Sequence, residues 1–364
     1  MKTIIKRMFL KMLFILHHYK HERFYEHVMK VNGIKNCSTL GERKWHEKWR
    51  LGGAISVTQY RVFFHYIGPN VNIVPEEICH DIIEPLLNPH RFVGYYADKN
   101  VFDKLFPEGY MPKTLFRRMN GIYYDADYKR IIKPEEEIGQ LLSRSATGRA
   151  IIKPSIDGMS GRGVQMIDDA NKITLEYLNS GFGKDFIVQE AVSQSDYISQ
   201  FNPTSVNTLR LSVYRSVKDD APLVTGAIMR IGGKGSVVDN AHAGGCYVGI
   251  HSDGTFCHEV LDQYGQKRTC FNNIDFKQDF RYPNWEEVVE FGKSVCQYVP
   301  HHRLLALDIV LDKMNKPHLI EFNVLYFSTW LFQYTTGPAF GEYTDEILDY
   351  CKGKLKDIEY QLMI

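Results

Sequence analysis

The order of apolar and polar positions divides the 364-residue chain into a helical beginning and a strand-rich remainder. Residues 4–16 are mostly apolar, and polar, helix-compatible sequence follows as far as Leu51. A further helix is predicted to open at Pro75, because proline suits a first turn and the two acidic residues behind it interact favourably with the helix dipole. Residues 1–95 are therefore expected to form a mostly helical region.

Short apolar runs rich in β-branched and aromatic residues recur in the rest of the chain and predict strands. They lie at residues 121–124, 150–153, 186–192, 205–214, 223–231, 305–311 and 318–323. Helices are predicted from Pro134, over 284–299, and from Tyr343 to about Tyr360. A polar turn at 312–317 separates the last two strands, so they are expected to pair as a hairpin.

Three oxygen-bearing side chains lie in this hairpin. Asp308 is in its first strand, and Glu321 and Asn323 are two residues apart in its second, so these two project from the same face. A carboxylate inside an apolar strand is costly unless a cation or hydrogen-bond donors compensate it. Mg²⁺ is commonly held by one or two carboxylates together with substrate phosphates. The pattern predicts a Mg²⁺ site, with solvated charges on an edge strand as the alternative.

A second motif follows the strand at 150–153. Lys153 ends that strand, and Gly158, Gly161 and Gly163 follow in a short loop. Glycines let backbone N–H groups approach phosphate oxygens, and the lysine can place a cation beside them. In a P-loop the lysine follows the glycines instead. A phosphate-binding loop is expected, and a plain glycine-rich hairpin turn is the alternative.

Composition narrows the classes of function. The chain has 44 Lys and Arg residues against 43 Asp and Glu, so its overall charge gives no indication of a nucleic-acid partner. The seven cysteines follow no disulfide or zinc-ligand pattern, which is typical of reduced thiols in the cytoplasm. The apolar start is too short to span a bilayer and has no cleavage site behind it. A cytoplasmic protein is expected.

Positive charge is concentrated near the N-terminus. The first fifty residues contain 12 Lys and Arg residues and 4 Asp and Glu residues. A basic helix with a wide apolar face suits an interfacial helix on an anionic membrane. It also suits a helix docked on the protein's own core or on a partner. These alternatives remain open for residues 4–16.

Together these motifs resemble the ATP-grasp superfamily, and more narrowly the sugar-transfer-associated ATP-grasp family. The resemblance covers roughly residues 55–350, and its motifs occur in the expected order: Asp98-Lys99, the strand lysine with its glycine loop, a strand ending near Glu190, and Asp308 with Glu321-Phe322-Asn323. It implies an α+β ATP-grasp fold in which two lobes with antiparallel sheets clamp Mg-ATP. The expected parts are a helical region (1–95), a linker and small lobe (96–188), and a large lobe with a C-terminal helix (189–364).

The resemblance also implies roles for individual residues. Lys99 and Lys153 would contact the nucleotide phosphates, and Lys104 competes with Lys99 for that role. Glu190 would accept a hydrogen bond from the adenine amino group. The remaining expected nucleotide contacts are the glycine loop, Asn207, and backbone groups near Ala191 and Val192. The metal ligands would be Asp308, Glu321 and Asn323, with two Mg²⁺ ions expected.

Two arginines on neighbouring strands complete the expected site. Arg210 and Arg230 would stabilise charge on a transferring phosphoryl group, with ion pairs to nearby acids as the alternative. The resemblance implies a carboxylate–amine ligase that forms an acylphosphate and modifies a surface polysaccharide or amino sugar, acting on a small carboxylate and an amine or sugar. A small-molecule kinase and a non-catalytic nucleotide-binding module are the alternatives. Its basic N-terminus would then contact a glycan-assembly partner or the inner face of the membrane.

Overall fold

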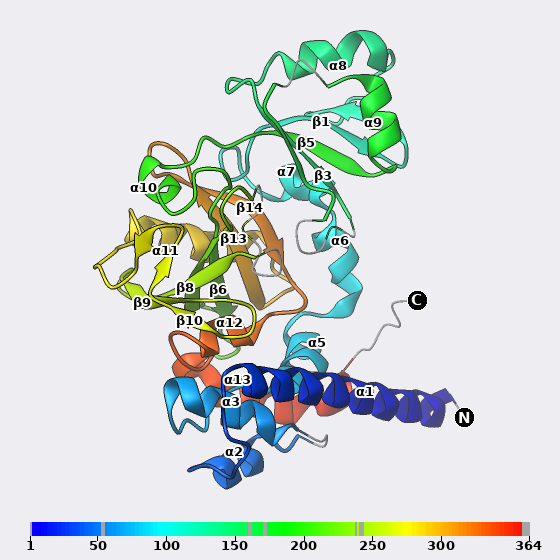
Figure 1. Cartoon of the computed structure of the whole chain (residues 1–364). Coiled ribbons are helices and arrows are strands. Elements are labelled where there is room, and N and C mark those ends of the chain that lie inside the picture. The colour runs from blue at the N-terminus through cyan, green and yellow to red at the C-terminus, as the bar shows by residue number, and fades with distance from the viewer. Residues whose placement is uncertain are drawn as a thin grey trace.

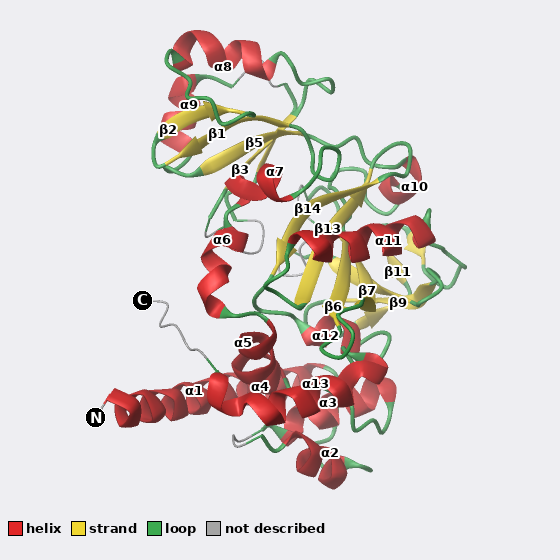
Figure 2. Cartoon of the chain, turned by 180° about the vertical axis from the view of Figure 1, so that it is seen from behind, coloured by secondary structure: helices red, strands yellow, loops and turns green. Residues whose placement is uncertain are grey.

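The computed structural model describes residues 2–51, 55–156, 158, 162–169, 173–236, 239 and 244–358. Within this part of the chain, a helical base, a large sheet and a small sheet follow one another along the long axis of the molecule (Figure 1). The view from behind shows short helices, α6 (Val93–Ala97) and α7 (Phe102–Leu105), running from the base toward the small sheet (Figure 2).

The helical base joins segments from both ends of the chain. It comprises α1 (Lys2–Val31), α2 (Glu42–Trp49), α3 (Val57–Ile67), α4 (Glu76–Ile78), a π-helical turn (Cys79–Ile83), α5 (Glu84–Leu87), α12 (Thr329–Gln333) and α13 (Thr344–Lys354). One apolar cluster holds these helices together and includes Tyr25, Phe63, Phe332 and Leu348. The C-terminal helix, which was expected to close the large lobe, therefore packs among the N-terminal helices.

The large lobe is built on a seven-stranded antiparallel sheet in the order β10-β9-β8-β7-β6-β13-β14. Its strands are β6 (Leu209–Arg215), β7 (Pro222–Ile231), β8 (Cys246–Ile250), β9 (Phe256–Leu261), β10 (Lys267–Arg268), β13 (Leu304–Leu311) and β14 (Pro317–Asn323). Helix α11 (Trp285–Val295) covers one face of this sheet through a second apolar cluster. The large lobe also contains the short helix α10 (Asp196–Ser199) and a two-stranded pair, β11 (Cys270–Phe271) with β12 (Ile274–Asp275).

The predicted hairpin is confirmed. Strands β13 and β14 pair antiparallel, with Asp308 opposite Glu321, and a register shift follows Asp308. On its other side β13 pairs with β6, where Arg210 lies opposite Asp308. Every residue of β13 is buried. This register therefore places the Asp308 carboxylate inside the sheet, with Arg210 beside it.

The small lobe is a five-stranded antiparallel sheet in the order β2-β1-β5-β3-β4. Its elements are β1 (Thr114–Met119), β2 (Ile122–Asp125), β3 (Ala150–Pro154), β4 (Gln165–Ile167), β5 (Phe186–Glu190), α8 (Pro134–Leu142) and α9 (Leu175–Gly181). Both helices pack on one face, where Phe116, Leu178 and Phe186 are fully buried. The opposite face carries Lys153 and is turned toward the large lobe.

The strand predicted at 205–214 begins later than expected. Strand β6 starts at Leu209, so Asn207 lies in the segment before it. The Asn207 side chain is fully buried, and its amide donates to the backbone oxygens of Ile198 at 3.1 Å and Asn202 at 3.0 Å. The alternating pattern could not distinguish this buried loop support from a strand residue. The nucleotide contact expected for Asn207 stays a prediction.

Candidate nucleotide and metal site

Charged side chains from both lobes meet between the two sheets. The Lys99 ammonium lies 2.8 Å from the Glu321 carboxylate on β14. The Lys153 ammonium, which β3 carries, donates to the backbone oxygen of Ile320 at 3.2 Å. Residues distant in sequence are therefore brought together, and Lys153 reaches from the small sheet to β14.

Lys99 is placed by a short turn that is tied to the glycine loop. The Asp98 carboxylate accepts from the backbone N–H of Asn100 at 2.9 Å and caps a 3-10 turn at Lys99–Val101. The Lys99 N–H donates to the Ser155 oxygen at 2.9 Å, at the start of the loop. By contrast, the Lys104 ammonium lies over the Tyr128 ring, 4.0 Å from its centre. Of the two competing lysines, only Lys99 is placed in the charged cluster.

Asp308 is held by both predicted catalytic arginines. Arg210 donates to its two carboxylate oxygens at 2.9 and 2.8 Å, and Arg230 lies 3.1 Å from one of them. Burial alone would raise the pKa of Asp308, but these guanidinium groups hold it below its usual range. The arginines thus form ion pairs. Both pair with Asp308, a predicted metal ligand, and Arg230 also lies 3.6 Å from Asp239.

The third predicted ligand lies in the same cluster. The Asn323 amide nitrogen is 3.5 Å from an Asp308 oxygen and 3.4 Å from the Ala306 oxygen. No group of three or more His, Cys, Asp or Glu side chains in the described chain is placed to hold a metal. Two carboxylates and an amide would need further oxygens to complete a Mg²⁺ coordination shell, and nucleotide phosphates are the usual source. This donor set therefore fits a metal that arrives with a polyphosphate.

The balance of charge in the cluster also fits such a ligand. Lys99, Lys153, Arg210 and Arg230 are present against the carboxylates of Asp308 and Glu321, and Asp239, 3.6 Å from Arg230, adds a third carboxylate, so positive charge is still in excess. Lys153 is only 5% exposed, and burial lowers its pKa to about 8. A buried ammonium that donates its hydrogen bond to a neutral carbonyl is poorly compensated. A polyphosphate would supply the missing negative charge.

The glycine loop follows β3 directly. Gly163 has φ +73°, and a Cβ there would lie 2.8 Å from the Pro154 ring, so a side chain would be both strained and obstructed. Gly158 is less constrained, because a Cβ there would lie 3.5 Å from the Pro154 oxygen. Gly161 is outside the described residues. Gly163 is thus required by the backbone, whereas a phosphate contact for the glycines stays a prediction.

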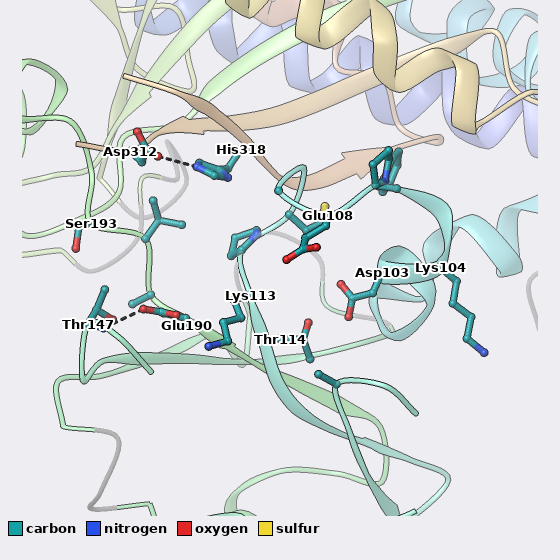
Figure 3. Close-up of a pocket in the computed structure, with 18 of the residues that line it drawn as sticks. Asp103, Lys104, Glu108, Lys113, Thr114, Thr147, Glu190, Ser193, Asp312 and His318 are labelled. Atoms are coloured by element: carbon teal, nitrogen blue, oxygen red, sulfur yellow. Dashed lines mark hydrogen bonds and ion pairs between the residues drawn. The ribbon is translucent and has the colours of Figure 1, made fainter. Parts of the chain in front are cut away.

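A cavity of about 930 Å³ borders the hinge between the lobes (Figure 3). This hinge pocket includes Glu190, Ala191 and Val192, which were predicted to contact adenine. The Glu190 carboxylate accepts from the Thr147 N–H at 2.9 Å, and the Ala191 N–H donates to the Arg149 oxygen at 3.1 Å. Figure 3 shows Glu190 near Lys113 on one side of the pocket, with Asp312 and His318 on the other.

The hinge pocket and the charged cluster are separate in the described part of the chain. Lys99, Lys153, Arg210, Arg230 and the three predicted metal ligands do not line the pocket. The contact between Lys153 and Ile320 joins the small sheet to β14 beside the charged cluster. We expect a nucleotide that reaches from the hinge to the cluster to replace this contact.

The helical base supports β13 and the segment after β14, a role that the sequence did not reveal. The Asn88 amide donates to the oxygens of Leu304 and Val324, each at 2.7 Å, and so joins the start of β13 to the segment after β14. The Glu84 carboxylate accepts from the backbone N–H groups of Tyr326 and Phe327. Burial raises the pKa of Glu84 to about 8. No role for Glu84 was predicted from the sequence, since its partners lie more than 240 residues away along the chain.

Comparison with known families agrees with this geometry. The family model described as sugar-transfer associated ATP-grasp matches residues 80–347. The chain belongs to this family. The matched range contains both lobes, the hinge and every predicted site residue, so the ATP-grasp fold expected from the motifs is confirmed. Helices α1, α2 and α3 lie before it.

Three solved structures are similar to this chain at low sequence identity. The D-cycloserine synthetase DcsG has a TM-score of 0.41 and 13% identity, covering 75% of this chain and 74% of that one. The D-alanyl-alanine synthetase A of Vibrio cholerae has a TM-score of 0.40 and 13% identity, covering 73% and 66%. The ATP-grasp ligase PsnB, solved with Mg and ADP, has a TM-score of 0.39 and 14% identity, covering 73% and 61%.

The chain spans between about half and three quarters of the length of the solved structures it matches. No curated protein sequence matches this ATP-grasp chain.

Proposed function

We propose that the protein is an ATP-dependent carboxylate–amine ligase. The observation that carries the proposal is the cluster of two carboxylates, one amide and four cations between the lobes of an ATP-grasp fold. Lys99 and Lys153 would bind the nucleotide phosphates, and Asp308, Glu321 and Asn323 would hold Mg²⁺. The metal would neutralise charge on the phosphates.

The proposed reaction has two steps. A substrate carboxylate oxygen attacks the γ-phosphorus of ATP, the bond to the β-phosphate oxygen breaks, and ADP and an acylphosphate form. An amine then attacks the acyl carbon, phosphate leaves, and the amine loses a proton to give an amide. Arg210 and Arg230 flank Asp308 and are placed to stabilise negative charge beside the metal ligands. The family description supports a sugar or surface polysaccharide as the setting of this chemistry.

Hydroxylamine provides a test, because this small nucleophile can replace the natural amine. Amino acids and sugar acids are incubated singly with the protein, ATP, Mg²⁺ and hydroxylamine. An accepted carboxylate should yield a hydroxamate, ADP and phosphate in equal amounts, and Arg210→Ala should reduce all three together. A stable phosphorylated product with neither hydroxamate nor free phosphate would instead establish a kinase.

A further inference from the structure

Helix α1 presents apolar side chains on two opposite faces. Tyr25, Val28 and Met29 are buried in the base, and His17 lies 2.6 Å from the Asp81 carboxylate. Four exposed apolar side chains form a second set on the other side of the helix: Met12, Ile15, Leu16 and Tyr19. Their spacings of three and four residues place them on one helix face, and we call this set the exposed stripe.

The exposed stripe is uncovered in the described chain. Its side chains are exposed by 50% at Met12, 65% at Ile15, 56% at Leu16 and 64% at Tyr19. Figures 1 and 2 show that the N-terminal part of α1 extends past the other helices of the base. Isolated apolar residues are common on protein surfaces, whereas contiguous apolar patches mark interaction sites. Four exposed apolar residues on one helix face therefore indicate a binding surface.

The surrounding charge indicates the chemistry of that partner. Lys2, Lys6, Arg7, Lys11 and Lys20 all precede the first acidic residue of the chain, Glu22. Lysine and arginine can lay their long apolar stems along an interface while their charged groups reach outward. An apolar stripe among basic residues complements an anionic lipid surface.

We propose that α1 binds the surface of an anionic membrane, with the exposed stripe buried at the boundary between headgroups and acyl chains. The helix would lie in the plane of the surface, because no helix in the described chain is long and apolar enough to cross a bilayer. The C-terminal half of α1 already packs in the base through Tyr25, Val28 and Met29, so binding through the N-terminal part needs no unfolding of the protein. The inference is independent of the proposed ligase activity.

The test compares sedimentation of the full-length protein with vesicles of phosphatidylglycerol and phosphatidylcholine and with vesicles of phosphatidylcholine alone. Wild type should bind the anionic vesicles and lose binding as salt increases. The double variant Ile15→Asp/Leu16→Asp should lower the partition coefficient more than about tenfold, because two carboxylates replace apolar side chains at the interface. Lys11 and Lys20 stand four residues from the new acids, so the substitutions suit a helix.

A matched control introduces two aspartates at exposed apolar positions outside α1. Leu40 and Ile132 are 73% and 71% exposed and lie outside α1, so Leu40→Asp/Ile132→Asp should bind vesicles like wild type. Equal binding by both double variants, or equal binding of wild type to uncharged vesicles, would overturn the proposal. It would also be overturned if light scattering showed a wild-type dimer that Ile15→Asp/Leu16→Asp dissociates, with no vesicle binding by either protein. Unchanged thermal unfolding of the variants would verify that the fold is intact.

Discussion

Asp308→Asn is expected to weaken Mg-ATP binding and also to destabilise the protein, whereas Glu321→Gln should chiefly weaken binding. Both changes remove a carboxylate from the predicted metal site, which should lower affinity at least tenfold for the loss of one charge-assisted contact of about 1.5–3 kcal/mol. Their structural settings differ. Asp308 is 4% exposed and neutralises two arginines, while the Glu321 side chain is 29% exposed and pairs with one lysine.

The two variants should differ in stability because they leave different cations without a carboxylate partner. Removing one partner of a buried ion pair leaves an uncompensated charge and costs roughly 3–5 kcal/mol. Asp308→Asn would leave Arg210 and Arg230 without this carboxylate, so its free energy of unfolding should fall by roughly that amount. Glu321 is partly exposed and pairs with one lysine, so the loss of stability in Glu321→Gln should be smaller.

Calorimetric titration with ATP in the presence of Mg²⁺ and urea unfolding measure the two effects separately. Glu259→Gln is a suitable control, because Glu259 forms an exposed ion pair with Lys267 on β9 and β10, away from the cluster. Affinity like that of wild type in both Asp308→Asn and Glu321→Gln would remove these residues from the metal site. Equal stability of the two variants would contradict the role assigned to the arginine pairs.

Lys153→Met is expected to reduce affinity for ATP by about 1.5–3 kcal/mol while leaving affinity for adenosine unchanged, because the lost contact is with phosphate. The same substitution should raise the free energy of unfolding at pH 7. Burial lowers the pKa of Lys153 from 10.5 to about 8, so its ammonium costs stability below pH 8. This cost should disappear as pH rises from 8 toward 10.5.

The pH dependence of binding gives this prediction an independent readout. Phosphate binding requires the protonated lysine, so wild-type affinity for ATP should fall as pH rises through about 8. This fall should be absent in Lys153→Met and present in Lys104→Met, since Lys104 borders the hinge pocket. Equal losses for ATP and adenosine in Lys153→Met, or an unchanged pH profile, would place Lys153 away from the phosphates.

The sequence predicted the local pieces of the site well, because each depended on contacts between near neighbours. Asp308 pairs with Glu321 across a turn of a few residues, and Lys153 ends its strand immediately before the glycine loop. Asn207 shows the limit of such patterns, because a buried loop amide and a strand residue occupy the same alternating positions. The pairing of Arg210 with Asp308 spans 98 residues, and only the strand order could reveal it.

The helical base was predictable as helices but not as a support for the site. Glu84 and Asn88 bond the segment after β14 across more than 200 residues, and periodicity carries no information about such contacts. Tyr326, which Glu84 holds, has φ +54°, a conformation that side-chain-bearing residues rarely adopt. The turn at Tyr326, which follows β14, is thus held by a helix that is distant from it in sequence.

A crystal structure with a non-hydrolysable ATP analogue and Mn²⁺ in place of Mg²⁺ would test the central claim most directly. The anomalous signal of manganese should lie among Asp308, Glu321 and Asn323. The analogue's phosphates should contact Lys99 and Lys153, with the bonds of these lysines to Glu321 and Ile320 broken. Manganese elsewhere, or a nucleotide confined to the hinge pocket with the contact between Lys153 and Ile320 intact, would contradict the account.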